Sequence, residues 1–410
     1  MSRKTIGPRN KVKGDSGIRN TACYACGIAL SKNNRSSEHI IPNSLGGKLK
    51  SRNLMCVECN SNFGKTIDNY LAEDFMFFSN AFNVKRQRGT PQPIPMKRDK
   101  TGEQLLRFPD GTLRRSKPTY SITKEADGDK LNVEARNKSE LKSILKGLQK
   151  RKKLPSFDID KAMEQSKDVW IDFEVGHISF AIGSEETFRA ISKIALNYFF
   201  LKGGKREDAL DCIAYLKGRS DSERVWYFYP DNDIIKDRRD DEILHSIGIT
   251  GNPKTRLLLA HVELFSACRF IVLINDNYTG NKIDFNYHYD VVNQTVITKI
   301  FSPAIERDEI LQIFNNSELP LESFQNAMEN VNKVIWKFSN EQGLNRIVDR
   351  ALKRFQKEHD FSSLDEMTAA KLIAAYATEE AEPLIRRSAE IKHAAAARTF
   401  LNQTKVNDSD

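Results

Sequence analysis

Two pairs of cysteines near the start of the chain have the spacing of a metal site. Cys23 and Cys26 form one C-x-x-C pair, Cys56 and Cys59 form a second, and 29 residues separate the pairs. Four thiolates from two such pairs can surround one ion as a tetrahedron, which is the arrangement of structural Zn²⁺. The alternatives are coincidence and a redox pair, but redox C-x-x-C motifs usually come singly and near a βαβ pattern. The sequence therefore predicts a structural zinc site.

A carboxylate and a histidine lie between the two cysteine pairs. Glu38 and His39 are adjacent in residues 37–43 (SEHIIPN), and His39 is the only histidine among the first 176 residues. A neutral imidazole can take a proton from water, and a carboxylate oxygen suits a hard cation such as Mg²⁺ or Mn²⁺. Phosphodiester hydrolysis needs both, a nucleophile made from water and charge relief at the phosphate. A lone histidine is more often structural, but the grouped carboxylate and amides favour catalysis here.

The order and spacing of these residues resemble the HNH, or His-Me finger, endonucleases. The closest subgroup reads C-x-x-C, EHIIP with Gly-Gly, Asn-Leu, and C-x-x-C-N with Gly-Lys and Ile-Asp, all present over about residues 21–70. The resemblance implies a ββα-metal fold and an enzyme that cuts or nicks DNA with one divalent ion. It implies that His39 is the general base and Glu38 a ligand of the catalytic ion. Asn53 would brace the histidine loop by hydrogen bonding.

The last position of the motif has two candidates. Asn60 directly follows the second cysteine pair, whereas the common spacing from Asn53 selects Asn62. The resemblance implies that this residue is catalytic and helps to hold the divalent ion. We favour Asn60, because a zinc knuckle fixes local geometry more tightly than a count through a turn. Asp68, two helical turns after Asn60, is expected to be structural, with support of the site residues as the alternative.

The positive charge of the chain is concentrated around this motif. Residues 1–100 hold 18 lysines and arginines against 7 aspartates and glutamates, whereas the other 310 hold 46 against 48. A basic surface attracts polyanions, so we expect double-stranded DNA as the partner. The candidates for phosphate contact are Lys48, Lys50, Arg52 and Lys65. The alternatives are a merely solvated basic arm and a catalytically silent zinc module that only binds nucleic acid.

The remaining sequence indicates an α+β chain with a mixed middle region and a mostly helical C-terminal region. We expect a basic flexible arm over residues 1–20, the nuclease domain over 21–84, a linker with a hairpin over 85–119, an α+β domain of unknown role over 120–318, a helical region over 319–401 and a polar tail over 402–410. Apolar periodicity predicts strands over 169–175 and 270–274, a helix after the N-cap Ser184, and an alanine-rich helix over 367–401 that is interrupted at Pro383.

Composition excludes several classes of protein. No apolar run approaches the roughly 20 residues of a membrane helix, and the basic N-terminus lacks the apolar segment of a secretory signal. Six cysteines are too few for a secreted disulfide framework of 410 residues. We therefore expect a cytoplasmic protein without a membrane partner. A nuclease motif on a large C-terminal region favours restriction or anti-phage defence, with a mobile-element nuclease as the alternative. That region could dock a partner protein of the defence system or a second copy.

Overall fold

The computed structural model describes residues 21–98, 102–125, 128–151, 157–166, 176–177, 182–303, 305–316, 320–360 and 363–382. The expected basic arm over 1–20, the expected strand over 169–175 and everything after residue 382 lie outside the described residues.

The chain divides into two compact units, each made of separate segments. The first takes its described residues from Met1–Pro95, Arg107–Pro109 and Ile178–Trp336, and the second takes its residues from Met96–Leu106, Asp110–His177 and Lys337–Asp410. The α+β class is confirmed, with helices dominating after residue 320. This division differs from the consecutive domains expected from the sequence, because the cysteine-rich segment and the sheet after residue 220 share one unit.

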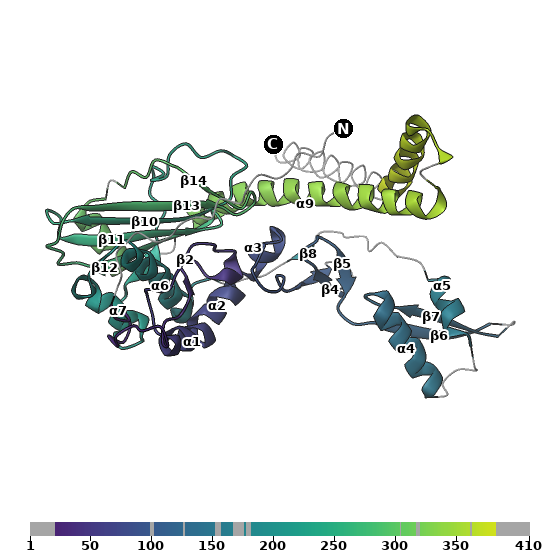
Figure 1. Cartoon of the computed structure of the whole chain (residues 1–410), viewed down its shortest axis with the longest axis horizontal. Coiled ribbons are helices and arrows are strands. Elements are labelled where there is room, and N and C mark those ends of the chain that lie inside the picture. Colours follow the sequence, from purple (N-terminus) through teal and green to yellow (C-terminus); the bar gives the residue numbers. More distant parts are fainter. Residues whose placement is uncertain are drawn as a thin grey trace, which may run out of the picture. The chain divides into compact units, whose positions relative to one another are not determined.

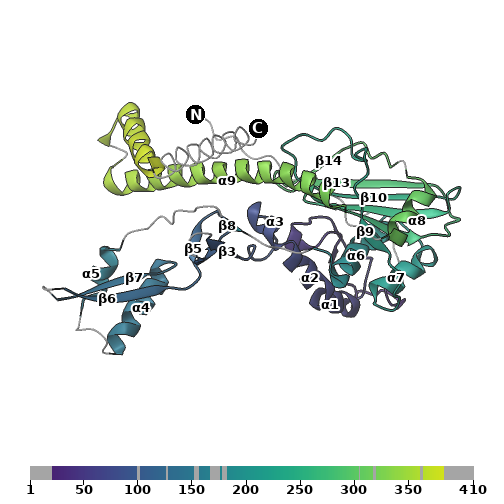
Figure 2. The same ribbon diagram turned by 180° about the vertical axis from the view of Figure 1, so that it is seen from behind.

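The first unit is built around a six-stranded antiparallel sheet (Figures 1 and 2). Its order is β14 (Thr295–Ile297), β13 (Ile283–Asp290), β10 (Leu244–Asn252), β11 (Leu257–Leu264), β12 (Cys268–Asn275) and β9 (Val225–Tyr227). Ile247 in the middle of β10 lies opposite Val262 on β11 and Tyr287 on β13. The buried strand expected over residues 270–274 is confirmed as part of β12.

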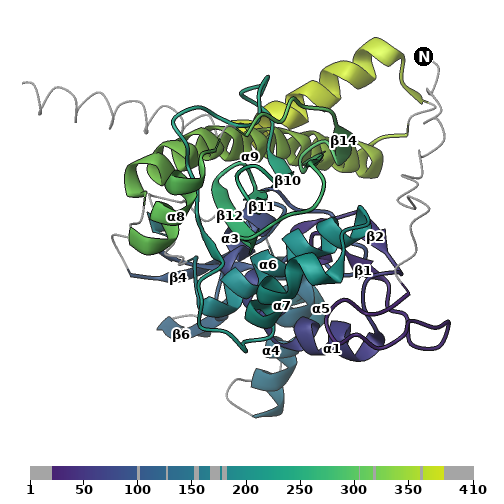
Figure 3. The same ribbon diagram turned by 90° about the vertical axis from the view of Figure 1, so that its left-hand side faces the viewer.

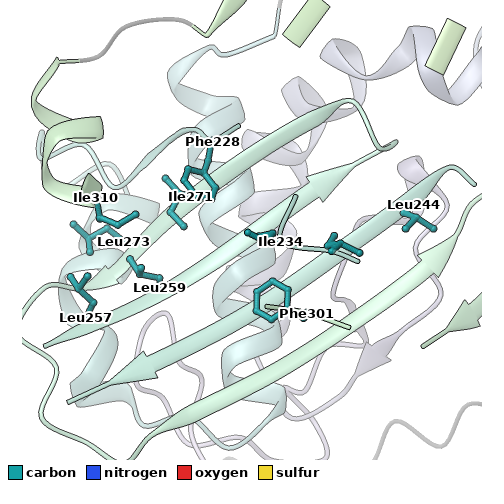
Figure 4. Close-up of a cluster of buried hydrophobic side chains, with 10 residues drawn as sticks. Phe228, Ile234, Leu244, Leu257, Leu259, Ile271, Leu273, Phe301 and Ile310 are labelled. Atoms are coloured by element: carbon teal, nitrogen blue, oxygen red, sulfur yellow. The ribbon is translucent and has the colours of Figure 1, made fainter. Parts of the chain in front are cut away.

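Each face of this sheet packs against other elements, as alternating side chains of a strand require. On one face a hydrophobic core gathers around Phe301 and around Ile310 of α8 (Arg307–Asn316), as Figure 4 shows. The other members of this core are Phe228, Ile234, Ile235, Leu244, Leu257, Leu259, Ile271 and Leu273. The opposite face carries Phe270, whose ring contacts Phe188 of α6 (Glu185–Leu201).

Helix α6 connects the sheet to the cysteine-rich segment. It begins where expected, because the Ser184 hydroxyl accepts the Thr187 N–H at 3.2 Å and acidic residues follow in the first turn. It contacts β9, β10, β11 and β12, and it also packs against α2 (Ile67–Asp74). Nearly all of its residues are therefore buried, including the polar side chains of Lys193 and Asn197.

The cysteine-rich segment forms short elements beside α6 (Figure 3). These are β1 (Glu38–His39), η1 (Asn43–Leu45), β2 (Lys50–Ser51), α1 (Val57–Lys65), α2 and α3 (Met76–Ala81). Phe265, at the turn between β11 and β12, stacks on Phe78 of α3 with ring centroids 5.2 Å apart. The Tyr24 ring stacks on Phe200 of α6 at 4.5 Å. These aromatic contacts bury the segment against the sheet and α6.

Two further elements after α6 anchor the backbone of the first cysteine pair. They are η2 (Arg206–Ala209) and α7 (Leu210–Leu216). Arg206 Nε donates to the Tyr24 carbonyl at 2.9 Å, and Lys217 Nζ donates to the Ala25 carbonyl at 3.2 Å. The first cysteine pair is thereby tied to residues nearly 200 positions later.

The second unit contains small sheets and helices. Strands β3 (Ile94–Arg98), β4 (Gln104–Arg107), β5 (Leu113–Arg115) and β8 (Gly176–His177) form a sheet of order β5-β4-β3-β8 that lies mostly in this unit. A hairpin of β6 (Thr119–Glu125) and β7 (Gly128–Glu134) precedes α4 (Lys138–Lys150) and α5 (Ile159–Glu164). The long helix α9 (Leu321–Glu358) belongs to this unit from Lys337 on, and a helix over 366–382 follows it. No helix among the described residues is both long and apolar enough to span a membrane.

The segment expected as a linker with a hairpin contains more regular structure than its sequence indicated. The hairpin is present, because β4 and β5 are neighbours across residues 108–112. The proline-rich part before it also contributes β3, whose Ile94 and Met96 are buried. Their period-2 alternation is hidden by the interspersed prolines, which normally argue against a strand.

Gly47 offers a test of the loop that joins β1 to β2. A Cβ atom at Gly47 would lie 1.8 Å from the Ile41 carbonyl oxygen, whereas a Cβ at Gly64 in α1 would meet nothing within 4 Å. We expect Gly47→Ala to lower the free energy of unfolding by about 3 kcal/mol, because the backbone must move apart. Gly64→Ala should leave it unchanged or raise it by up to about 1 kcal/mol. Urea unfolding of both variants measures this, and equal stability would contradict the structure of this loop.

Candidate active site and zinc site

The four cysteines of the two pairs converge on one point. Cys23 and Cys26 lie in the turn before β1, and Cys56 and Cys59 lie at the start of α1, where Cys56 is the N-cap. The four Sγ atoms all lie within 4.8 Å of one another, and those of Cys26 and Cys56 are 3.8 Å apart. Zn–S bonds of about 2.3 Å in a tetrahedron place sulfurs roughly 3.8 Å apart, so the cluster has the geometry of a structural zinc site.

The electrostatics of the cluster also fit a bound cation. Burial raises the pKa of the Cys23 thiol, and burial together with the nearby Cys23 raises the pKa of Cys59. Zinc binds the deprotonated form, and the free energy of its binding offsets the cost of bringing thiolates together. A divalent cation is therefore the group that would stabilise these four side chains in this arrangement.

Glu38 and His39 make up the whole of β1. Glu38 lies opposite Ser51 and His39 lies opposite Lys50 on β2, and the Ile40 N–H extends the pairing by donating to the Leu49 carbonyl at 2.9 Å. Helix α1 follows at residue 57. The expected order of two strands and a helix is confirmed, with the acid and the histidine side by side in the first strand.

The Glu38 carboxylate is buried and bound by α6. Its Oε1 lies 2.7 Å from Nζ of Lys193 and accepts a hydrogen bond from Nδ2 of Asn197 at 3.4 Å. Burial raises the pKa of Glu38, and the positive charge of Lys193 opposes that shift. Among the described residues, the ion pair with Lys193 and the hydrogen bond from Asn197 are both made by Oε1. The protein therefore holds this carboxylate through one oxygen.

Lys193 binds a second carboxylate as well. Its Nζ lies 2.6 Å from Oδ2 of Asp68 on α2, and only 1% of its side chain is exposed. Burial acts to lower the pKa of Lys193, but the charges of Asp68 and Glu38 outweigh burial and raise that pKa. We call Glu38, Asp68 and Lys193 the buried ion triad. One positive and two negative groups give the triad a net charge of −1.

The imidazole of His39 is half-buried. Its Nε2 has no hydrogen-bond partner among the described residues. Burial, followed by the charges of Lys50 and Lys48, lowers the pKa of His39 to about 4. The ring is therefore neutral near pH 7 and has the protonation state of a proton acceptor. The His39 carbonyl accepts a hydrogen bond from Asn197 Nδ2 at 3.2 Å, so α6 holds both residues of β1.

The three asparagines of the motif occupy different surroundings. Asn60 in α1 donates from Nδ2 to the Ser36 hydroxyl at 2.5 Å, which joins α1 to the chain entering β1. Asn62, one half-turn later, has an exposed side chain. The Asn53 N–H donates to the Ser51 hydroxyl at 3.1 Å, but no hydrogen bond among the described residues joins the Asn53 amide to His39. The expected bracing role of Asn53 stays a prediction.

Of the four basic residues expected to contact phosphate, one forms a hydrogen bond within the protein and three are exposed. Lys48 Nζ donates to the Lys85 carbonyl at 2.7 Å, and burial lowers the pKa of Lys48. Lys50, Arg52 and Lys65 are exposed. The exposed three are accessible to a polyanion, whereas Lys48 also serves the local fold.

Lys193 and Asn197 are the site residues that the sequence analysis missed. They lie far along the chain, and Asn197 follows Glu38 by 159 residues. The available signal was a lysine and an asparagine four positions apart within the mostly apolar run 190–200, where a polar side chain needs a buried partner. The identity of that partner was not readable from the sequence.

Substitution of the cysteines tests the zinc site. We expect one zinc ion per wild-type chain and loss of that ion in Cys56→Ala, because three thiolates no longer complete the tetrahedron. Cys212→Ala is the matched control, since Cys212 is fully buried in α7 and outside the cluster. Elemental analysis of the purified proteins gives the zinc content. Full zinc content in Cys56→Ala would rule out the site.

Comparison with known proteins identifies one part of the chain. Residues 23–76 match the HNH endonuclease family. No curated protein and no solved structure shows significant similarity to the chain. The matched segment contains both cysteine pairs and runs from the first of them through β1, β2, α1 and α2. The match to the HNH endonuclease family therefore covers the segment that carries Glu38, His39 and the four cysteines.

Proposed function

We propose that this protein is a metal-dependent endonuclease that hydrolyses phosphodiester bonds of DNA, by cutting or nicking a duplex. The observation that carries the proposal is the adjacent Glu38 and His39 in β1, within the segment that matches the HNH endonuclease family. A binding module alone has no need of an acid and a base between its cysteine pairs.

Each residue of the site has a role in this reaction. The neutral imidazole of His39 accepts the proton of the attacking water. Glu38 and the amide of Asn60, with Asn62 as the alternative, would hold a divalent ion, and their oxygens suit Mg²⁺ or Mn²⁺. Both side chains that hold Glu38 bind its Oε1, which supports that fit. Bound there, the ion would stabilise the negative charge that develops at the phosphate.

The exposed basic residues would hold the DNA backbone against this site. Lys50 on β2 lies opposite His39, and Arg52 and Lys65 are exposed nearby in sequence, with Lys48 as a fourth candidate. Contacts of this kind position a duplex without reading its sequence.

We further propose a cytoplasmic role in restriction or anti-phage defence, with a mobile-element nuclease as the alternative. The support is the small share of the chain that the nuclease segment occupies, 54 of 410 residues. The larger remainder would supply targeting, control, or a surface for a partner protein or a second copy.

A catalytically silent module that only binds nucleic acid is the second candidate. One observation favours it, since the ammonium of Lys193 lies 2.7 Å from Glu38 and already partly neutralises that carboxylate. The cleavage assay below separates the two candidates.

The first experiment is cleavage of supercoiled plasmid DNA by the full chain in Mg²⁺ or Mn²⁺. We expect nicked or linear product, and a rate lowered roughly 100-fold to 10,000-fold in His39→Ala, which is the usual effect of removing a general base. His359→Ala is the matched control, because His359 bonds to Tyr376 in the second unit. Equal cleavage rates for wild type and His39→Ala would contradict the role of His39 as the general base. DNA binding without any cleavage would favour the catalytically silent module.

The salt dependence of DNA binding tests the basic residues. Affinity should fall steeply with salt, because each phosphate contact releases counterions. Lys50→Ser and Arg52→Ser should each reduce the slope of log K against log salt by about 1, whereas Lys282→Ser, at an exposed lysine before β13, should not. Fluorescence anisotropy of a labelled duplex between 50 and roughly 200 mM salt measures the slopes. An unchanged slope in both site variants would remove these residues from the interface.

A further inference from the structure

Helix α6 presents two polar side chains to β1. Lys193 and Asn197 are four residues apart, so they lie on one face of the helix. Both bind the same oxygen of Glu38, with Lys193 Nζ at 2.7 Å and Asn197 Nδ2 at 3.4 Å from Oε1. Asn197 Nδ2 also reaches the His39 carbonyl at 3.2 Å. Neither residue lies in the segment that matches the nuclease family.

The orientation of the Asn197 amide is fixed by its partners. Its Oδ1 accepts the Tyr24 hydroxyl at 2.7 Å, and its Nδ2 faces two acceptors, Glu38 Oε1 and the His39 carbonyl. A flipped amide would place its oxygen against both acceptors. Asn197 therefore donates toward β1 and accepts from Tyr24.

We propose that Lys193 and Asn197 are positioning residues of the nuclease site, which hold Oε1 of Glu38 so that Oε2 stays directed to the divalent ion. This inference rests on the proposed nuclease function. It extends the working site from residues 23–76 to a helix that precedes the six-stranded sheet. The side chains act through Glu38 and His39 and touch neither water nor phosphate.

The charge of the triad supports positioning over blockage. Lys193 divides its charge between Glu38 and Asp68, which lies 2.6 Å away, so it does not neutralise Glu38 alone. The net charge of −1 still attracts a cation. Among the described residues, both donors bind Oε1 of Glu38.

The test is a charge-balanced double variant, Lys193→Met with Asp68→Asn, in the full zinc-loaded chain. It removes one positive and one negative group, so the net charge of the triad, Glu38 included, stays at −1. A change in Mn²⁺ affinity then reports the orientation of Glu38 instead of the local charge. We expect the half-saturating Mn²⁺ concentration to rise by about 10-fold to 100-fold, the usual effect of losing a residue that orients a ligand. Titration calorimetry without DNA and plasmid nicking should both record this shift.

Two further variants complete the design. Lys202→Met is the matched control and should bind Mn²⁺ as the wild type does, because Lys202 is the C-cap of the same helix and its Nζ lies over the Tyr198 ring. Asn197→Ala removes the neutral donor, and it should also raise the half-saturating Mn²⁺ concentration. This single variant tests the inference if the double variant does not fold. Zinc content and thermal unfolding confirm that each protein is intact.

The outcomes separate this inference from the proposed function. Wild-type protein that binds Mn²⁺ without cutting DNA would defeat the nuclease proposal, while the shift in Mn²⁺ affinity would still support positioning. The opposite outcome is cleavage that depends on His39 together with wild-type Mn²⁺ affinity in both the double variant and Asn197→Ala. It would overturn the positioning role of Lys193 and Asn197 and would still support the nuclease proposal. Wild-type protein that binds no Mn²⁺ would overturn both.

Discussion

The ammonium of Lys193 lies between two carboxylates, 2.7 Å from Glu38 and 2.6 Å from Asp68, with 1% of the side chain exposed. Removing a charge from water costs several kcal/mol, which only close and well-bonded partners offset. The two partners come from β1 and α2, so this one group fixes three elements against each other. Breaking a buried pair by removing one partner typically costs about 3–5 kcal/mol, because the other charge stays buried. The position of the acid beside His39 is thus coupled to the fold of the first unit.

The nuclease segment depends on the rest of the unit for its core as well. Strands β1 and β2 have two residues each, and such a short pairing has little stability of its own. Phe265, between β11 and β12, stacks on Phe78 of α3, and the Tyr24 ring stacks on Phe200 of α6. These contacts supply stability that the strands lack, and zinc bound by the four cysteines would add to it, since structural zinc contributes folding free energy directly. The family motif is therefore embedded in a larger core.

The sequence was informative where the determinants are local. The cysteine spacing, the acid–histidine pair and the Ser184 cap each act within a few residues, and the structure has the sulfur cluster, the ββα order and the start of α6. The unit division and the triad were not predictable, because they depend on which distant elements pack together. Lys193 is an example. A lysine within an apolar run is expected to be buried and to need an acidic partner, but the sequence does not identify which of the 55 acidic residues is that partner.

The basic side chains of the N-terminal quarter differ in how exposed they are. Its excess charge is not all available to DNA, because the amine of Lys48 is bound to the Lys85 carbonyl and is half-buried. Lys50, Arg52 and Lys65 remain exposed. Beside this positive surface the buried ion triad keeps a net negative charge, which repels a phosphate but attracts a cation. A divalent ion held by Glu38 would supply positive charge where a phosphate approaches. The charge arrangement is therefore one more reason for the proposal of a metal-dependent nuclease.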